Sequence, residues 1–390
     1  MSADPVDADG PIVVDLFGAG WRLDPSGLGE VLGRRVLALW HRARVPVSSG
    51  HEDVEDFVVR RRDGGELELA GSVHGPTPDD EVPYALSRAL TSASIARRTG
   101  HTLMFHAAGL ASPGGETLAL VAPSGTGKTT AARVLGRDLG YVTDETLAVE
   151  TDLTVLPYPK PLSVVDDPAE PTRKTEWSPD ELGLRAPTGP LRLAGVVLLH
   201  RDPGVDEPAL DAVGLVEGAA EVLSQTSAVL ALPEPMTRLA RALTVGGGPW
   251  RLTYRDIGDC LALLTDLLER PAEPRADWWA EVGSTGGTPV SAPAAPPGPT
   301  ALHTWVERTP FTQALHEPGA TLVMLGQLPH TVPGLGALAW RQAATPVPVE
   351  RILAAAVAEH GAHPDAERVI VDTVDVLVDS GLLRRVVPPV

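Results

Sequence analysis

The sequence predicts an α/β protein with more than one domain, and three observations carry this prediction. The chain has 390 residues, which is more than a single hydrophobic core usually spans. A glycine-rich loop at residues 122–127 stands between an apolar run and a helical pattern, and the order strand, loop, helix is typical of an α/β core. Residues 283–300 are rich in Pro and Gly and contain almost no large side chain, as expected of a linker.

These observations divide the chain into four regions. We expect a β-rich region with a helix leading into the core at 1–100, the α/β core at 101–282, the Pro/Gly-rich linker at 283–300 and a small α+β domain at 301–390. In this C-terminal domain, a pair of strand-like runs precedes three helical patterns that alternate with Pro and Gly stops. The linker is expected to be a semi-flexible tether, so the C-terminal domain can move relative to the core.

In the N-terminal region, apolar runs broken by Gly, Pro and Asp predict short strands at 11–18, 36–43 and 56–61. A helical period follows, and it predicts a helix from residue 82 that ends at Gly100. In the core, the runs 103–111 and 117–122 predict strands on either side of a turn, and the glycine loop is followed by a helix with Gly140 as its stop. Further strands are expected at 141–150, 154–159, 193–200 and 250–255, and further helices at 215–227, 236–245 and 257–270.

Composition restricts the functional class. A net charge of −19 argues against extended contact with nucleic acid or an anionic membrane, because both demand a basic patch. The first twenty residues lack a basic region, and no stretch reaches the roughly 18 apolar residues of a membrane span. We therefore expect a cytoplasmic protein whose partner is a peptide or a protein. The single cysteine, Cys260, is expected to be a small core residue.

The glycine loop has the chemistry of a phosphate-binding loop. Gly125 and Gly127 allow consecutive backbone N–H groups to turn inward, Lys128 can reach the outer phosphates, and the Thr129 hydroxyl can bind magnesium. Ala122 stands where the full pattern has glycine. The loop therefore predicts the phosphates of a nucleotide and Mg²⁺ as ligands, held by Ser124, Gly125, Thr126, Gly127, Lys128, Thr129 and Thr130.

Lysine is rare in this chain. Only Lys128, Lys160 and Lys174 occur beside 29 arginines, and the codon usage of a GC-rich genome explains the average. It does not explain the placement of Lys128 in the loop and of Lys160 in the segment PYPKPLSV. Lys160 either reaches a phosphate oxygen or covers the surface with its stem, and both alternatives stay open.

An acidic pair, Asp144 and Glu145, follows the predicted helix. One or two carboxylates suit Mg²⁺ on phosphates, and a hydroxyl acceptor needs a base within hydrogen-bond reach. Neighbouring side chains on a strand point to opposite faces, so we expect one of the pair, Asp144, to face the nucleotide. Two alternatives remain: both acids are solvated loop residues, or Asp202, at the end of an apolar strand, has the metal-binding role.

The segment from Phe105 to Val149 resembles the core of the HPr kinase/phosphorylase-like family, and the resemblance covers about residues 95 to 200. It implies a P-loop core of the HPr kinase type, related to the PEP carboxykinase fold, that transfers phosphate from ATP to a hydroxyl. The resemblance implies catalytic roles for His106, near the phosphates, and for Asp144. For His106 the alternative of a hydrogen-bonded histidine next to the sheet stays open. Magnesium would be held by Thr129, Asp144 and Glu145. Lys160 lies in a segment that resembles one found in relatives of this group. The pair is Asp-Glu here, whereas the typical kinase has Asp-Asp.

Residues 305 to 386 are similar to PqqD-like domains, on a pattern of two strands, three helices and the ending LVDSGLLRRV. These small winged-helix modules recognise leader peptides of ribosomally made, modified peptides, and the peptide adds as a strand to the edge of their sheet. The alternative is a generic winged helix for DNA. It is disfavoured because the helical pattern at 366–381 is acidic where a recognition helix would be basic.

Two functions follow from the two resemblances. The first is a peptide kinase whose tethered domain raises the local concentration of its precursor peptide. The second is a non-catalytic recognition protein, like the accessory proteins of daptide-type clusters, that presents the precursor to a modifying enzyme from the same pathway. Intact Lys128, Thr129 and Asp144 favour the kinase, whereas Ala122 and Glu145 favour the recognition protein.

Overall fold

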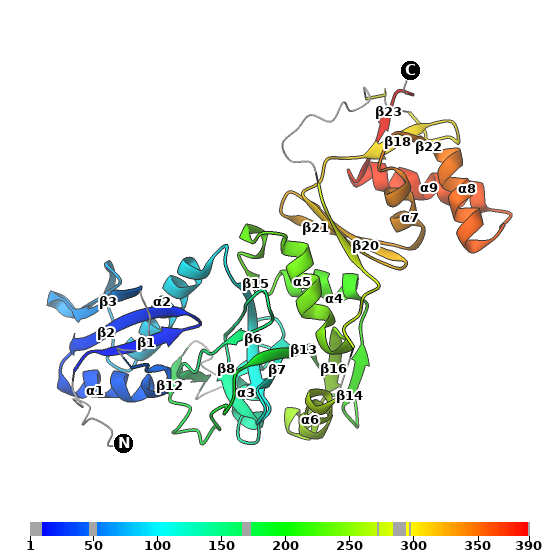
Figure 1. Ribbon diagram of the computed structural model, residues 1–390. Coiled ribbons are helices and arrows are strands. Elements are labelled where there is room, and N and C mark those ends of the chain that lie inside the picture. Colours follow the sequence, from blue (N-terminus) through cyan, green and yellow to red (C-terminus); the bar gives the residue numbers. More distant parts are fainter. Residues whose placement is uncertain are drawn as a thin grey trace. The chain divides into compact units, whose positions relative to one another are not determined.

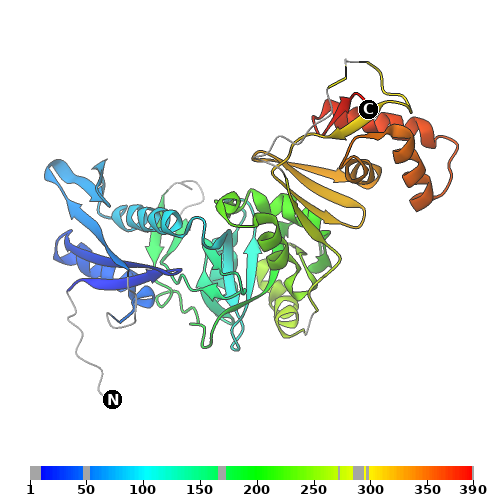
Figure 2. The ribbon, with the colours of Figure 1, turned by 45° about the horizontal axis from the view of Figure 1, so that its top comes forward.

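The structure of the protein is a computed structural model that describes residues 10–46, 53–165, 173–270, 273–283, 294–295 and 298–388. Across these residues the chain is mixed α/β, with nine α-helices and several β-sheets (Figures 1 and 2). The predicted α/β class is confirmed. Most of the predicted linker, residues 284–293 and 296–297, lies outside the described residues. No helix in the described ranges is long and apolar enough to cross a membrane.

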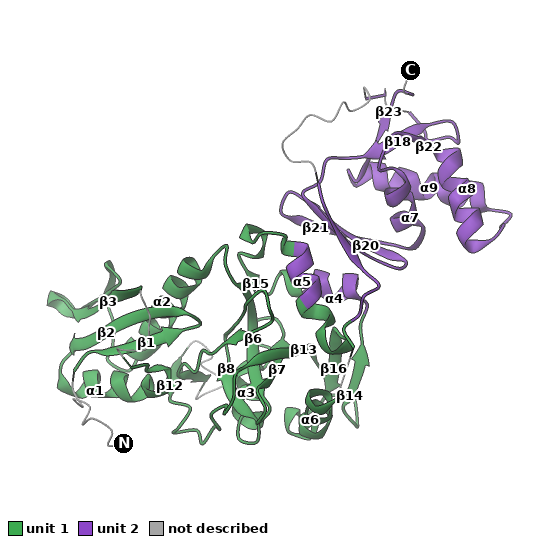
Figure 3. Ribbon diagram, in the orientation of Figure 1, with its two compact units in different colours: residues 1–213, 222–235, 242–274 green, residues 214–221, 236–241, 275–390 purple. Residues whose placement is uncertain are grey.

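The chain folds into two compact units (Figure 3). Unit 1 comprises residues 1–213, 222–235 and 242–274, and unit 2 comprises residues 214–221, 236–241 and 275–390. The two short stretches of unit 2 belong to helices α4 (Leu215–Leu223) and α5 (Pro235–Thr244), which precede its long C-terminal segment in the sequence. Each unit is described by itself below.

Unit 1 begins with a five-stranded sheet in the order β1 to β5. Its strands are β1 (Ile12–Leu16), β2 (Ala19–Gly27), β3 (Val54–Arg61), β4 (Glu66–Leu69) and β5 (Ser72–Pro76). β2 and β3 pair in parallel, while the other neighbours pair antiparallel. A parallel pair needs a crossover connection, and helix α1 (Glu30–Leu39) lies within it.

The strand predicted at 36–43 is wrong, because these residues form the end of α1 and a short 3₁₀ turn. Val36, Leu39, Trp40 and Ala43 are all buried, and their spacing of three, four and seven residues is that of one helix face. The helix predicted from residue 82 is confirmed as α2 (Val82–Arg98).

The central sheet of unit 1 has nine strands. Along it lie β10 (Val155–Leu156), β9 (Thr146–Val149), β6 (Leu103–Ala111), β7 (Glu116–Val121), β13 (Arg192–Arg201), β16 (Trp250–Tyr254) and β14 (Ala209–Ala212), with β8 (Gly140–Thr143) and β15 (Thr226–Ser227) also paired to β6. β7, β13 and β16 are mutually parallel, so their carboxyl ends meet at one edge of the sheet. Ligands bind at that edge in open α/β sheets. Buried Cys260 lies just before helix α6 (Leu261–Glu269), which packs against β7 and β13.

Helix α3 (Lys128–Leu135) follows the glycine loop and ends four residues earlier than expected. Its cap is Gly136, and Gly140 instead begins strand β8. A Cβ at Gly140 would lie 3.0 Å from the backbone of Pro187, so this glycine permits a close approach between segments. The prediction of Gly140 as a helix stop is therefore wrong. Beside the central sheet, β11 (Leu162–Val165) and β12 (Lys174–Trp177) pair antiparallel.

The C-terminal segment of unit 2 contains two small sheets and three helices. The first sheet has the order β17 (Trp279–Val282), β19 (Gln313–Glu317), β20 (Ala320–Leu325) and β21 (Leu328–Pro333), and the second has β22 (Val347–Pro348), β18 (Trp305–Arg308) and β23 (Leu383–Val386). The helices are α7 (Gly334–Gln342), α8 (Val349–His360) and α9 (Ala366–Asp379). The three helices and the β19 and β20 strands confirm the predicted elements, and β21 leaves one edge of its sheet without a described partner strand.

Candidate functional site

The glycine loop connects β7 to α3, which is the context that the phosphate-loop motif requires. Gly125 and Gly127 have φ angles of 81° and 107°, values that a residue with a Cβ rarely adopts. Ala122 is buried and is not among the residues with positive φ, so alanine fits there without strain. The Lys128 Nζ donates hydrogen bonds to the carbonyl oxygens of Ala122 at 2.6 Å and Pro123 at 3.1 Å. Phosphate oxygens can replace these two acceptors.

Thr129 and Asp144 are joined directly. The Thr129 Oγ1 donates to Asp144 Oδ2 at 2.9 Å, and the Tyr141 hydroxyl donates to Asp144 Oδ1 at 3.1 Å. Asp144 is buried, so its carboxylate is held in one orientation by these partners. A threonine hydroxyl next to a carboxylate oxygen is the donor set that Mg²⁺ takes in phosphate-loop proteins.

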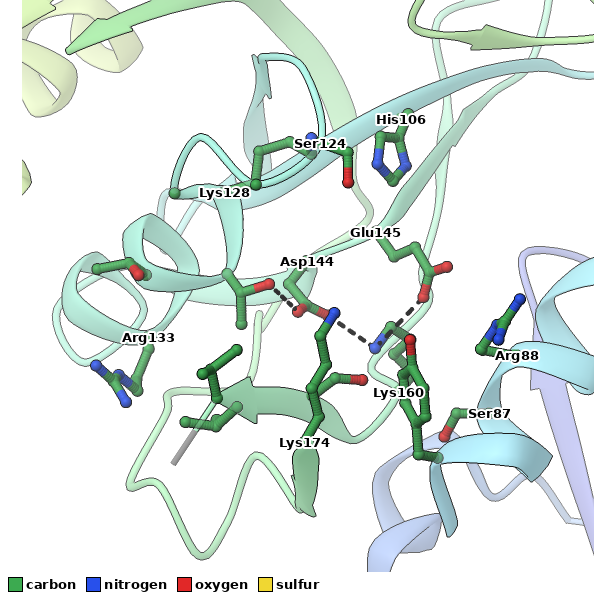
Figure 4. A pocket seen from close by; sticks show the side chains of 18 residues that line it. Ser87, Arg88, His106, Ser124, Lys128, Arg133, Asp144, Glu145, Lys160 and Lys174 are labelled. Carbon is green, nitrogen blue, oxygen red and sulfur yellow. Dashed lines mark hydrogen bonds and ion pairs between the residues drawn. The ribbon is translucent and has the colours of Figure 1, made fainter. Parts of the chain in front are cut away.

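Asp144 and Glu145 form the turn between β8 and β9. Both carboxylates face Lys160, whose Nζ lies 3.1 Å from Asp144 Oδ1 and 3.5 Å from Glu145 Oε2. Figure 4 shows the three side chains converging. The expectation that only one of the two acids faces the site is wrong, because the alternation of a strand does not apply within a turn. Lys160 is itself buried and donates to the Pro161 carbonyl at 2.7 Å.

A cavity of about 390 Å³ lies over these residues (Figure 4). Its lining includes the predicted site residues His106, Ser124, Gly125, Gly127, Lys128, Thr129, Thr130, Asp144, Glu145 and Lys160. Thr126 does not line it and instead lines a second cavity. The alternative acid Asp202 lines neither cavity, and its carboxylate accepts a hydrogen bond from the Gly204 N–H.

Sequence reasoning missed one wall of this cavity. Helix α2 contributes Tyr84, Ser87 and Arg88, helix α3 contributes Arg133, and the β11–β12 hairpin contributes Ser163, Val164, Val165 and Lys174. One signal was available in the sequence, because the chain has three lysines in all, Lys128, Lys160 and Lys174. The structure shows that all three line this cavity. In a chain that otherwise uses arginine, the rarity of lysine could have pointed to Lys174.

The electrostatics of the cavity follow from burial. Burial lowers the pKa of Lys128 to about 8, although Asp144 and Glu145 oppose the shift. Burial and the Lys128 ammonium lower the pKa of His106, so its imidazole is neutral at pH 7. Burial also disfavours the charged form of Lys160, but the neighbouring carboxylates outweigh it and raise the pKa of this lysine.

A buried acid, Glu176 of β12, lies beneath this wall. Its carboxylate accepts hydrogen bonds from the Ser87 hydroxyl at 3.1 Å and from the Ser163 hydroxyl. Burial raises the pKa of Glu176 to about 7, while the Lys160 ammonium acts in the opposite direction. Glu176 therefore links α2, β11 and β12 behind the cavity and contributes a carboxyl that titrates near neutral pH.

A second cavity, of about 660 Å³, lies on the other side of the glycine loop. It shares Gly125, Gly127 and Thr130 with the first cavity. Its other lining residues are Pro123, Thr126 and the carboxyl-end segments 199–201 of β13 and 254–257 beyond β16. The loop thus borders two cavities, one with the acidic pair and one without it.

No protein-family model matches this chain, and no curated protein is similar to it.

Proposed function

We propose that unit 1 is an ATP-dependent kinase core of the HPr kinase type and that it phosphorylates a hydroxyl of a ribosomally made precursor peptide. One observation carries this proposal. The phosphate loop, the Thr129–Asp144 hydrogen bond and the carboxylate of Glu145 border a single cavity. A kinase needs these three components within reach of one γ-phosphate.

The residues fit Mg²⁺ and a triphosphate. Loop N–H groups and Lys128 would bind the phosphates, while the Thr129 hydroxyl and Asp144 would hold the metal. When bound, Mg²⁺ neutralises charge that develops on the phosphate oxygens. Neutral His106 can donate one N–H to a phosphate oxygen. The second cavity has no acidic pair and borders the same loop, so it suits the nucleoside.

The geometry favours Glu145 over Asp144 as the base. Asp144 is buried, and its oxygens already accept hydrogen bonds from Thr129 and Tyr141 and pair with Lys160. The Glu145 side chain is 32% exposed, and Lys160 is its ion-pair partner. In the transfer step the acceptor oxygen bonds to the γ-phosphorus, the bond to the bridging oxygen breaks, ADP leaves, and the hydroxyl proton passes to Glu145.

Unit 2 is proposed to recognise the precursor, as PqqD-like domains do. A groove of about 790 Å³ runs between the edge strand β21 and helix α9. Apolar side chains dominate its lining, among them Val332, Leu335, Val369 and Val376, and Val376 is 66% exposed. An extended leader segment can pair with the edge of β21 that has no partner strand among the described residues, and place its apolar side chains in this groove.

Nucleotide binding is tested first on the full chain. MgATP at millimolar concentration should raise the melting temperature, and Lys128→Ala should abolish the increase, because only a formed site links ATP to folding. Asp144→Asn should weaken the Mg²⁺-dependent component of this stabilisation. The matched control Asp202→Asn removes one carboxylate outside both cavities and should leave the response unchanged. No response of the wild type would contradict the nucleotide site.

Phosphoryl transfer is tested by mass spectrometry with precursor candidates encoded by short reading frames beside the gene. Glu145→Gln should keep ATP affinity within a few-fold and lower transfer by roughly 10² to 10⁴, the usual contribution of a general base. Val376→Asp should weaken leader binding in fluorescence polarisation, whereas Val31→Asp, on an exposed valine of unit 1, should not. A precursor that binds tightly but is never phosphorylated would support the non-catalytic recognition protein.

A further inference from the structure

The first cavity has an excess of positive charge. Arg88, Lys128, Arg133, Lys160 and Lys174 line it, against two acids. Both acids pair with the buried Lys160, which leaves four cations for a ligand. The whole chain carries a net charge of −19, so this concentration of cations is local. A cavity of this kind binds more than one anionic group.

The four cations lie on two walls. Lys128 and Arg133 belong to α3, next to the phosphate loop, whereas Arg88 comes from α2 and Lys174 from β12 (Figure 4). In the second wall, formed by Arg88 and Lys174, both cations lie near the ring of Tyr84. The Arg88 guanidinium lies 5.7 Å and the Lys174 Nζ 5.4 Å from the centre of its ring. Such contacts hold a cation near a ring without neutralising its charge.

Arg88 and Lys174 have no acidic partner within the ranges of the chain that the structure describes. Other cations nearby are paired, for example Arg173 with Asp80 at 2.9 Å and Arg35 with Glu181. Two unneutralised cations that line the same cavity make its potential positive and favour an anionic ligand there.

This wall belongs to the acceptor side of the site. The triphosphate already has the loop N–H groups, Lys128 and the metal ligands, and Arg88 and Lys174 do not line the second cavity, where the nucleoside is placed. Tyr84, Arg88 and Lys174 line the first of the two cavities and not the second. Glu145, the proposed base, lines the same space.

We propose that Arg88, Lys174 and Tyr84 form an acceptor-side subsite for carboxylates, so that the segment phosphorylated by this protein is acidic around its hydroxyl. The proposal rests on the proposed kinase function and names its substrate class. The net charge of the protein does not prevent such binding, because at physiological salt charges are screened beyond about 8 Å. The two cations in contact with the peptide then decide the local attraction.

The test uses the full chain, saturated with Mg²⁺ and a non-hydrolysable ATP analogue, and two acetylated, amidated pentapeptides. Both have serine in the centre, flanked in one by four aspartates and in the other by four asparagines. Calorimetry at about 150 mM salt, where the net charge of the protein is screened beyond about 8 Å, should show the acidic peptide binding at least about 10-fold more tightly to the wild type. This preference should decrease at higher salt, as expected for contacts between exposed charges.

The double variant Arg88→Gln/Lys174→Gln should reduce the preference to less than about 2-fold, while the affinity for the ATP analogue stays within 2-fold, since the nucleotide is bound by other residues. The matched control Arg22→Gln/Arg34→Gln removes two surface charges from other elements and should keep the preference. Equal binding of both peptides by the wild type would overturn the subsite. A double variant that loses nucleotide affinity and keeps the peptide preference would also overturn it.

Failure of the kinase proposal has a different readout. If the ATP analogue does not bind the wild type, the nucleotide site itself is refuted, whatever the peptides do. If the acidic peptide is preferred but mass spectrometry finds no phosphate transferred from ATP, the subsite stands and transfer is refuted. If the double variant unfolds, the single variant Arg88→Gln, on an exposed position, replaces it. This variant should reduce the preference for the acidic peptide from about 10-fold to about 3-fold, which is half of the binding free-energy difference.

Discussion

Replacing Lys160 by methionine tests the organisation of the acidic centre. The Lys160 side chain is 2% exposed and that of Asp144 is 3% exposed, with 3.1 Å between Nζ and Oδ1. Methionine keeps most of the stem but removes the ammonium, so Asp144 and Glu145 lose the cation with which both form ion pairs. Removing one partner of a buried ion pair destabilises a protein by about 3–5 kcal/mol, because the remaining charge stays buried.

For a unit of this size, each kcal/mol lowers the melting temperature by about 2–4 °C, so Lys160→Met should lower it by roughly 10 °C. Lys174→Met is the matched control: it makes the same change in the same cavity, at a lysine without an ion pair in the described residues. The unfolding free energy of Lys174→Met should differ from that of the wild type by no more than about 0.5 kcal/mol. Differential scanning calorimetry of the two variants measures the difference.

The loss of stability caused by Lys160→Met should depend on pH. Burial raises the pKa of Glu176 to about 7, although the Lys160 ammonium opposes this shift. Between about pH 4.5 and 7, the native state therefore keeps a proton on Glu176 that the unfolded chain has already released. The contribution of Glu176 to stability therefore falls as the pH rises through this window. Without Lys160, the pH range in which Glu176 loses stability extends above 7. The stability lost by Lys160→Met relative to the wild type should therefore be larger at pH 8 than at pH 5. Equal melting temperatures of the two variants at both pH values would refute the argument that Lys160 compensates buried carboxylates.

Three further predictions concern other regions of the chain. Lys128 has a pKa of about 8 in the protein without nucleotide, and bound phosphates favour its charged form. ATP affinity measured by calorimetry should therefore fall up to tenfold per pH unit above about pH 8, and this decrease should be absent in Lys128→Met. Gly127→Ala, at a φ of 107°, should weaken ATP binding at least about tenfold because a Cβ strains the loop, whereas Gly64→Ala, at a φ of 78° in a remote turn, should affect stability alone. The Glu317 carboxylate accepts from two N–H groups at the start of α4 and pairs with Arg275, so Glu317→Gln should destabilise unit 2 by about 1–3 kcal/mol in thermal unfolding.

Local patterns predicted the elements whose period or motif lies within one segment. The helix at 82–98 has a clear period, and the phosphate loop lies between β7 and α3 as the motif requires. The pattern failed at 36–43, where the consecutive apolar residues 36–40 concealed a helical spacing. It also failed at Gly140, whose role is to let Pro187 approach and not to end a helix.

Some residues of the candidate site could likewise be located from the sequence, and others could not. Gly125 to Thr129 and the acidic pair could be located from order and spacing, because the loop and the turn are each continuous in sequence. Arg88 lies in no motif and could not be located, and only the rarity of lysine in the chain singled out Lys174. They reach the cavity because α2 packs against β12, a contact between segments far apart in the chain.

By itself, the sequence determined the α/β class, the glycine loop between a strand and a helix, and the candidate acids, because glycine conformations, apolar periods and residue chemistry act over a few neighbouring positions. The tertiary structure alone decided that Asp144 and Glu145 share Lys160, that Asp202 lies outside both cavities, and that all three lysines line one of them. These facts depend on how α2, β12 and the central sheet pack. Burial and charge act between whichever side chains packing brings together, at any separation along the chain.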